Sequence, residues 1–140
     1  MERARELAGN KNLQIFLMSP SPEFVGLARR IVSHYIPDSK VKIVDIAVNG
    51  SESADVLAEI HSAKWADTAL FRLIRTTGQI GELVLRDLQS RVKELHAGRA
   101  FCISAGTFSE GAQTFVEARF IDLVEKDGLL KLLRRLSSPA

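Results

Sequence analysis

The C-terminal part of the chain restricts the fold most, because residues 99–136 hold four predicted elements joined by short turns. Arg99–Ser104 is a compact run of apolar, aromatic and β-branched residues, which predicts a strand buried on both faces. Ser109 is placed to cap a helix that follows a turn at Gly106. Ile121 and Leu123 alternate as in a short strand, after which leucines line one side of a final helix. This alternation of strands and helices is typical of an α/β domain.

The sequence before this part predicts a hairpin between two helices. Ser21 and Pro22 are typical of a helix start, and Asn49-Gly50 is a strong turn signal between strands. Residues 13–18 are interpreted as an edge strand or as a segment packed under the first helix. The other predicted elements are a helix from Ser21 to Pro37, strands over residues 40–48, 54–60 and 68–74, and a helix over residues 80–96 closed by Gly98.

These elements follow one another in the order α-β-β-β-α-β-α-β-α and predict an α/β fold with a central mixed sheet. We assign one domain to residues 13–137 and interpret residues 1–12 as a charged N-terminal tail. A chain of 140 residues, 46% of them hydrophobic, is large enough to bury a core of its own.

Residue types and their spacing exclude several kinds of site. Cys102 is the single cysteine, so the chain forms neither an intrachain disulfide nor a Cys-x-x-Cys pair. The three histidines fall on separate elements at no metal-ligand spacing, and the glycines form no phosphate-binding loop. No apolar run approaches the ~20 residues of a membrane span. We therefore expect a cytoplasmic protein without a membrane partner or a small-molecule cofactor.

A resemblance to Mrr-type restriction endonuclease domains is carried by the segment SAGTFSEGAQTFVEARFIDLVEKDGLLKLL. The residues that match the C-terminal pattern of that family are Phe108, Ser109, Ala112, Ile121, Leu123, Asp127 and Leu130. The segments SPEFVGLARRIV, SADVLAEI and RDLQSRVKEL are similar to the family's first helix, metal-binding strand and central helix. The resemblance implies a three-layer domain of the PD-(D/E)XK nuclease superfamily.

The family's catalytic positions are only partly filled in this chain. Asp55 matches the metal-binding Asp, although an Asp that caps the hairpin turn is the alternative interpretation. Arg72 falls on the Glu or Gln position, Ile74 on the catalytic Lys position and Val25 on that of a helical Glu. We expect Arg72 to neutralise Asp55 rather than to bind metal with it. Mg²⁺ is expected only if a carboxylate has migrated, for which Glu59 and Glu82 are the candidates.

The leading hypothesis is therefore an inactive nuclease-fold domain that binds DNA. Such binding needs only phosphate contacts, which we predict for four exposed basic residues: Arg72, Arg75, Arg86 and Lys93. The first alternative is a scaffold that uses the fold for protein contacts, with a second copy or other domains of a longer protein as partner. The second alternative is a thioredoxin-like adaptor without redox cysteines, in which residues 13–18 form the first strand.

Overall fold

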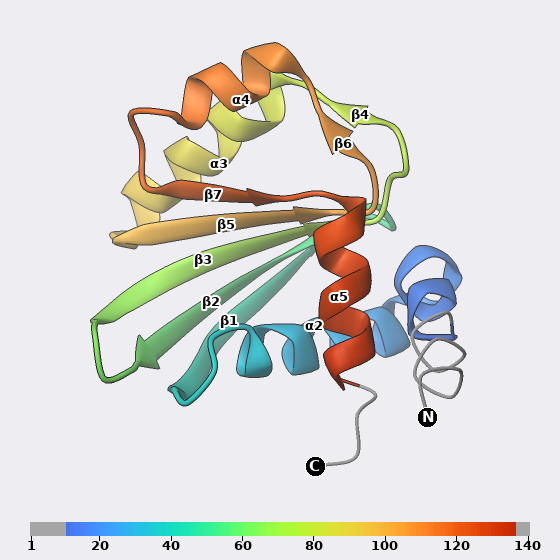
Figure 1. Cartoon of the computed structure of the whole chain (residues 1–140), viewed down its shortest axis with the longest axis horizontal. Coiled ribbons are helices and arrows are strands. Elements are labelled where there is room, and N and C mark those ends of the chain that lie inside the picture. The colour runs from blue at the N-terminus through green and yellow to red at the C-terminus, as the bar shows by residue number, and fades with distance from the viewer. Residues whose placement is uncertain (1–10, 137–140) are drawn as a thin grey trace.

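The computed structural model of the protein describes residues 11–136, which form a five-stranded sheet covered by helices on both sides (Figure 1). A helical segment over residues 11–18 comes first. The helices after it are α2 (Ser21–His34), α3 (Glu82–Leu95), α4 (Glu110–Val116) and α5 (Lys126–Leu136). The strands are β1 (Lys40–Asn49), β2 (Ser53–His61), β3 (Ala66–Ile74), β4 (Gln79–Ile80), β5 (Arg99–Ser104), β6 (Thr107–Phe108) and β7 (Ile121–Val124).

The large sheet is mixed, as predicted, with the strand order β1-β2-β3-β5-β7. β1, β2 and β3 pair antiparallel, and Gly50 turns the first hairpin with a φ of 61°. β3, β5 and β7 pair in parallel, because α3 and α4 carry the chain back between them. β5 is an interior strand whose residues from 100 to 104 are all buried, which confirms the prediction for Arg99–Ser104.

Two apolar cores lie on opposite faces of this sheet. The first is packed under α2 and α5 and includes Phe24, Ile31, Val56, Phe71, Leu73, Ile103, Leu129 and Leu133. The second is packed under α3 and α4 and includes Leu70, Leu85, Leu88, Cys102, Phe115 and Ile121. Successive residues of a strand point to opposite faces, so each interior strand supplies both cores.

Several local predictions need correction. Residues 11–18 are helical rather than strand-like, which removes the opening strand of the thioredoxin-like alternative and makes that alternative wrong. The residue that ends α3 in a left-handed conformation is His96, with a φ of 54°, and not Gly98. Ser21 is the first helical residue rather than the N-cap, which is Pro20. The predicted tail lies outside the described residues, except for residues 11 and 12.

A second small sheet, the parallel pair β4–β6, was not predicted. It brings Gly106 so close to the preceding loop that a Cβ atom there would lie 2.0 Å from the carbonyl oxygen of Gly78. Gly106 is therefore required by close backbone approach. The predicted cap of α4 is confirmed, because Ser109 Oγ accepts a hydrogen bond from Ala112 N at 3.1 Å. Among residues 11–136 no helix is long and apolar enough to cross a membrane.

Candidate functional site

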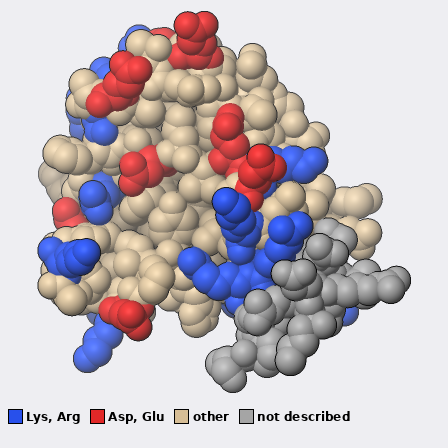
Figure 2. Space-filling model, in the orientation of Figure 1, with Lys and Arg blue, Asp and Glu red and all other residues tan. Residues whose placement is uncertain are grey.

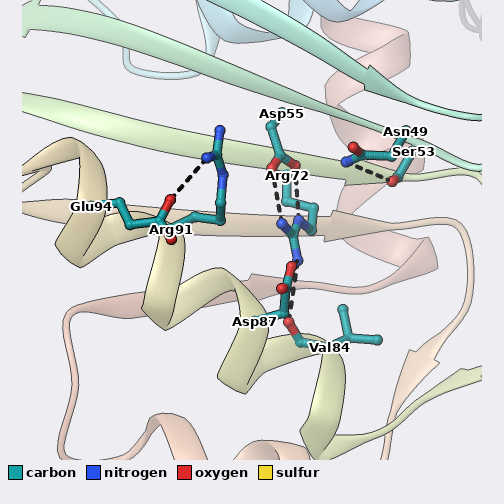
Figure 3. A network of polar contacts seen from close by, with 8 residues as sticks. All are labelled: Asn49, Ser53, Asp55, Arg72, Val84, Asp87, Arg91 and Glu94. Atoms are coloured by element: carbon teal, nitrogen blue, oxygen red, sulfur yellow. Dashed lines mark hydrogen bonds and ion pairs between the residues drawn. The ribbon is translucent and has the colours of Figure 1, made fainter.

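A hollow of about 790 Å³ opens between the turn of the β1–β2 hairpin, the last part of β3 and one side of α3. Its polar lining comes from the hairpin, from β3 and from α3, and includes Asn49, Glu52, Ser53, Asp55, Arg72, Asp87 and Arg91. Figure 3 shows that the side chains of β2 and β3 meet those of α3 across this hollow. We call it the Asp55 cleft.

Strand alternation places Asp55 on the α3 face of the sheet. Its neighbours Ala54 and Val56 point to the opposite core, and Leu57 returns to the α3 face. The antiparallel register sets Asp55 directly opposite Arg72 of β3. Asp55 is only 4% exposed and Arg72 6%, so both charges are removed from water.

The Arg72 guanidinium binds the Asp55 carboxylate through two parallel hydrogen bonds (Figure 3). Arg72 Nε donates to Oδ1 at 2.8 Å and Nη2 donates to Oδ2 at 2.9 Å. This bidentate geometry is the strongest that an arginine makes with a carboxylate. The predicted neutralisation of Asp55 by Arg72 is therefore confirmed, and each carboxylate oxygen accepts a hydrogen bond from the guanidinium.

The free side of the guanidinium meets α3. Arg72 Nη1 lies 2.8 Å from Oδ2 of Asp87 and donates to the carbonyl oxygen of Val84 at 3.3 Å. Burial by itself lowers the pKa of Arg72, but hydrogen bonds and charge from Asp55 and Asp87 outweigh it and raise that pKa above its ordinary value. Arg72 is therefore a permanent cation held between two carboxylates.

The residues of the cleft do not fit a divalent metal ion. Mg²⁺ takes several oxygen ligands at 2.0–2.1 Å, whereas both oxygens of Asp55 already accept from Arg72. Glu59 shares the face of Asp55 but lies four residues along β2, which is ~13 Å away at the rise of a strand. Glu82 pairs instead with Arg86 at 2.5 Å. Among residues 11–136 no three His, Cys, Asp or Glu side chains are grouped to hold a metal.

Two further groups of the α3 face lack the reactivity that hydrolysis needs. Ile74, at the position that the resemblance assigns to the catalytic lysine, is 6% exposed and has no proton to exchange. Cys102 pairs with Arg72 across the parallel register and is fully buried. Burial raises the pKa of the Cys102 thiol to about 12, so the thiol is protonated at neutral pH and is not a nucleophile.

Arg75 lies on the other face of the sheet and does not face solvent, contrary to the prediction. Its Nε donates to the carbonyl oxygen of Phe16 at 2.6 Å, Nη1 to that of Ser51 at 3.2 Å and Nη2 to that of Ser19 at 2.5 Å. Its guanidinium carbon also sits 4.5 Å from the centre of the Phe24 ring. Arg75 thus fastens the N-terminal helical segment to the sheet.

Arg86 and Lys93 are exposed on α3, as predicted, but they lie away from the Asp55 cleft. Arg86 pairs with Glu82 and covers the Phe115 ring of α4 at 5.0 Å. Lys93 lines a separate hollow beside the start of β7. The four basic residues predicted to contact phosphates therefore do not form one surface.

The sequence analysis missed Asp87 and Arg91, which complete the cleft from α3. Helical periodicity places Val84, Asp87 and Arg91 on one side of this helix, three and four residues apart. That signal was available in the sequence. The sequence does not show that this side of α3, rather than the side that carries Arg86, faces β3.

Comparison with known proteins gives a consistent family and fold. A family model for a restriction endonuclease domain, Mrr_cat, matches residues 23–133. The solved structure of the DNA modification-dependent restriction endonuclease AspBHI aligns with a TM-score of 0.59 and 16% identity, over 97% of this chain and 36% of that one. The MspJI restriction endonuclease, solved in complex with a 27-mer oligonucleotide, aligns with a TM-score of 0.57 and 14% identity, over 96% and 30%.

The two solved structures share the fold with this chain, which spans about a third of the length of each. No curated protein matches the sequence.

Proposed function

The chain belongs to the Mrr_cat family of restriction endonuclease domains, and from this premise we propose that it binds DNA without cleaving it. The observation that carries the proposal is the bidentate pair between Arg72 and Asp55. In the family's pattern, Asp55 would supply a metal ligand and the residue at Arg72 a second one. In this chain the residue at the second position is Arg72, and its guanidinium is bound to the Asp55 carboxylate at the first position.

Displacement of Arg72 by a metal ion would be costly. Separation of a buried pair leaves an uncompensated charge and destabilises a protein by about 3–5 kcal/mol. The incoming Mg²⁺ would gain one carboxylate, with Asp87 the nearest further acid, and would leave the Arg72 cation beside it. Repulsion between the two cations opposes such binding, so Asp55 is expected to stay paired in solutions that contain Mg²⁺.

DNA as the partner rests on the family and on the names of the two solved structures, one DNA modification-dependent and one bound to an oligonucleotide. Contacts between basic side chains and phosphates need no metal, so binding would persist without cleavage. Arg72 and Arg75 are unsuited to this role because their donors are bound within the protein. Exposed cations elsewhere on the chain would have to supply the contacts.

The test is a paired cleavage and binding assay on the purified chain, with unmodified and methylated duplexes and with Mg²⁺ or Mn²⁺. We expect weak binding, with a dissociation constant of roughly 10⁻⁴–10⁻⁶ M at physiological salt, and no cleavage. Cleavage that disappears in Asp55→Asn would contradict the proposal and would indicate a metal site formed at Asp55. Absence of binding at low salt would instead favour a module for protein contacts.

The variant Arg72→Gln/Ile74→Lys tests whether metal binding can be gained when the pair with Asp55 is removed. It returns two positions toward the family's pattern and frees Asp55 from its cation. Metal binding by this variant, measured by calorimetry, is expected to exceed that of the wild type. Ile74→Lys alone is the matched control, because it adds the lysine but leaves the bidentate pair of Asp55 in place.

A further inference from the structure

A dense group of basic side chains lies on the surface formed by α2 and α5. Figure 2 shows Lys and Arg atoms gathered over α5 and the adjoining part of α2. We define the α2–α5 basic surface by four exposed residues: Arg30 of α2 and Lys131, Arg134 and Arg135 of α5. At 100° per residue the three residues of α5 share the outer side of the helix, because Leu129 and Leu133 occupy its inner side.

Two of these arginines are held in place by the ends of the helices. Arg135 Nη2 donates to the carbonyl oxygens of His34 and Tyr35, at 2.8 and 3.2 Å, at the end of α2. Arg30 Nη2 in turn lies 3.5 Å from the carbonyl oxygen of Leu136, its acceptor at the end of α5. The partial negative charge of a helix C-terminus favours such contacts. Because each helix supplies an arginine to the C-terminus of the other, both guanidinium groups are held on one surface.

Their positive charge is not neutralised within the described part of the chain. The ion pairs among residues 11–136 involve only Arg72, Arg86 and Arg91 as cations. Carbonyl oxygens carry no formal charge, so the α2–α5 basic surface keeps four positive charges on a chain whose formal net charge is only +2. Arg86, by contrast, shares its charge with Glu82.

The chemistry of this surface favours a polyanion over a protein or a membrane. Protein interfaces have apolar centres, and helices that lie on membranes insert an apolar face. The large apolar side chains exposed in the described residues lie on neither α2 nor α5, and the apolar side of α5 is buried in the core. They are Met18, Val44, Val48, Leu83 and Phe120. An exposed group of cations without a large exposed apolar side chain among them is suited to phosphates.

We propose that the α2–α5 basic surface is where the chain holds the sugar-phosphate backbone of DNA, an inference that rests on the proposed function. The surface is on the opposite side of the sheet from the Asp55 cleft, since α2 and α5 cover one face and α3 covers the other (Figure 1). DNA bound there lies out of reach of Asp55. Binding there does not involve the cleft, and contacts to phosphates carry no sequence information by themselves.

The experiment compares two doubly neutralised variants of the full chain. Lys131→Gln/Arg134→Gln removes two cations of the surface whose side chains make no hydrogen bond or ion pair with the described residues. Arg86→Gln/Lys93→Gln is the matched control, because it removes the same charge from the α3 side, where the sequence predicted phosphate contacts. A fluorescent duplex is titrated at ~50 mM and ~200 mM salt, the range over which phosphate contacts weaken strongly. Thermal unfolding checks that both variants are folded.

We expect the surface variant to bind at least ~10-fold more weakly at the lower salt and to lower the slope of log K against log salt by about two. The control is expected to keep the affinity of the wild type within about twofold. Equal loss in both variants, or loss only in the control, would overturn the inference while the proposed DNA binding stands.

A wild-type chain that fails to bind the duplex at ~50 mM salt would end the proposed function and the inference together. If such a chain instead bound vesicles that contain phosphatidylserine, and lost that binding in the surface variant, the partner of this surface would be a membrane and the inference would be wrong. These outcomes can be told apart, because each comes from a different combination of protein (wild type or variant) and binding partner (duplex or vesicle).

Discussion

Each face of the central sheet buries one arginine, Arg72 of β3 or Arg75 directly after it, but the two guanidinium groups meet different partners. On the α3 face Arg72 is bound by the carboxylates of Asp55 and Asp87. On the α2 face Arg75 is bound by the carbonyl oxygens of Phe16, Ser19 and Ser51. The first arrangement pairs a buried cation with carboxylates, and the second ties the backbone of residues 16, 19 and 51 to the end of the sheet.

The different partners shift the pKa values of Arg72 and Arg75 in opposite directions. Burial lowers the pKa of Arg75, because neutral carbonyls cannot offset the loss of water. The pKa of Arg72 is raised despite burial, because two carboxylates favour the charged form. An arginine is thus used as a counter-ion on one face and as a structural clamp on the other. Variants can test each use separately.

Removal of Arg72 should have the largest effect on stability. Arg72→Leu leaves the Asp55 carboxylate buried without a partner, and we expect a loss of about 3–5 kcal/mol in the free energy of unfolding, measured with urea. Asp55→Leu/Arg72→Leu removes both charges and is expected to recover most of that loss. A double variant as unstable as the single one would mean that the pair matters for packing and not for charge.

Removal of Arg75 should have the next largest effect. Arg75→Leu leaves three carbonyl oxygens without a donor, and an unsatisfied buried polar group costs about 1–3 kcal/mol. We expect a total of about 2–3 kcal/mol, since water reaches part of this site, and faster hydrogen exchange in residues 11–18. Arg75→Lys keeps the charge without the forked geometry. If it matched the wild type in stability and exchange, the role of the three carbonyls would be refuted.

The sequence predicted the α3 face better than the α2 face for a physical reason. Asp55 and Arg72 carry opposite charges and fall on two positions that the family resemblance places at one site, and this was enough to predict their pairing. The partners of Arg75 are backbone carbonyls, which every residue has, so no residue type marks them. Asp87 was detectable by helical spacing, but its contact depended on the orientation of α3 against β3.

Short apolar runs explain the remaining errors. Residues 13–18 are apolar and fit a strand or a buried helix equally, since periodicity cannot separate the two at this length. Phe16, fully buried, decides in favour of the helix only once its core neighbours are known. β4 and β6, with two residues each, are too short to leave any pattern. Arg99–Ser104 was predictable because an interior parallel strand is apolar on both faces.

The thiol beside Arg72 should add a pH dependence to the α3 face. Cys102 has a pKa of about 12 in the folded protein against an ordinary value of 9.0. A folded pKa that is raised contributes stability below the unfolded pKa, and this stability is lost as the pH rises from about 9 toward 12. Between pH 9 and pH 10 the loss should be about 1 kcal/mol.

The measurement for Cys102 is urea unfolding at pH 8, 9 and 10, with Cys102→Ala as the control. Every other group is common to both chains and cancels in the comparison, so the difference between the two chains carries the effect. The difference in the free energy of unfolding between wild type and Cys102→Ala should become smaller as the pH rises. A difference that stays constant would show that the Cys102 thiol ionises equally in the folded and the unfolded protein.

The smallest effect should come from Asp87, the second carboxylate that holds Arg72. Its side chain is 65% exposed, so water and salt screen its charge, and pairs of this kind contribute about 0–1 kcal/mol. We expect Asp87→Asn to cost less than about 1 kcal/mol at low salt, with the cost shrinking as salt is added. Glu82→Gln, which breaks the exposed pair with Arg86, is the matched control. A cost for Asp87→Asn near that of Arg72→Leu would mean that both carboxylates are needed to hold the buried guanidinium, and that the pair with Asp55 does not suffice.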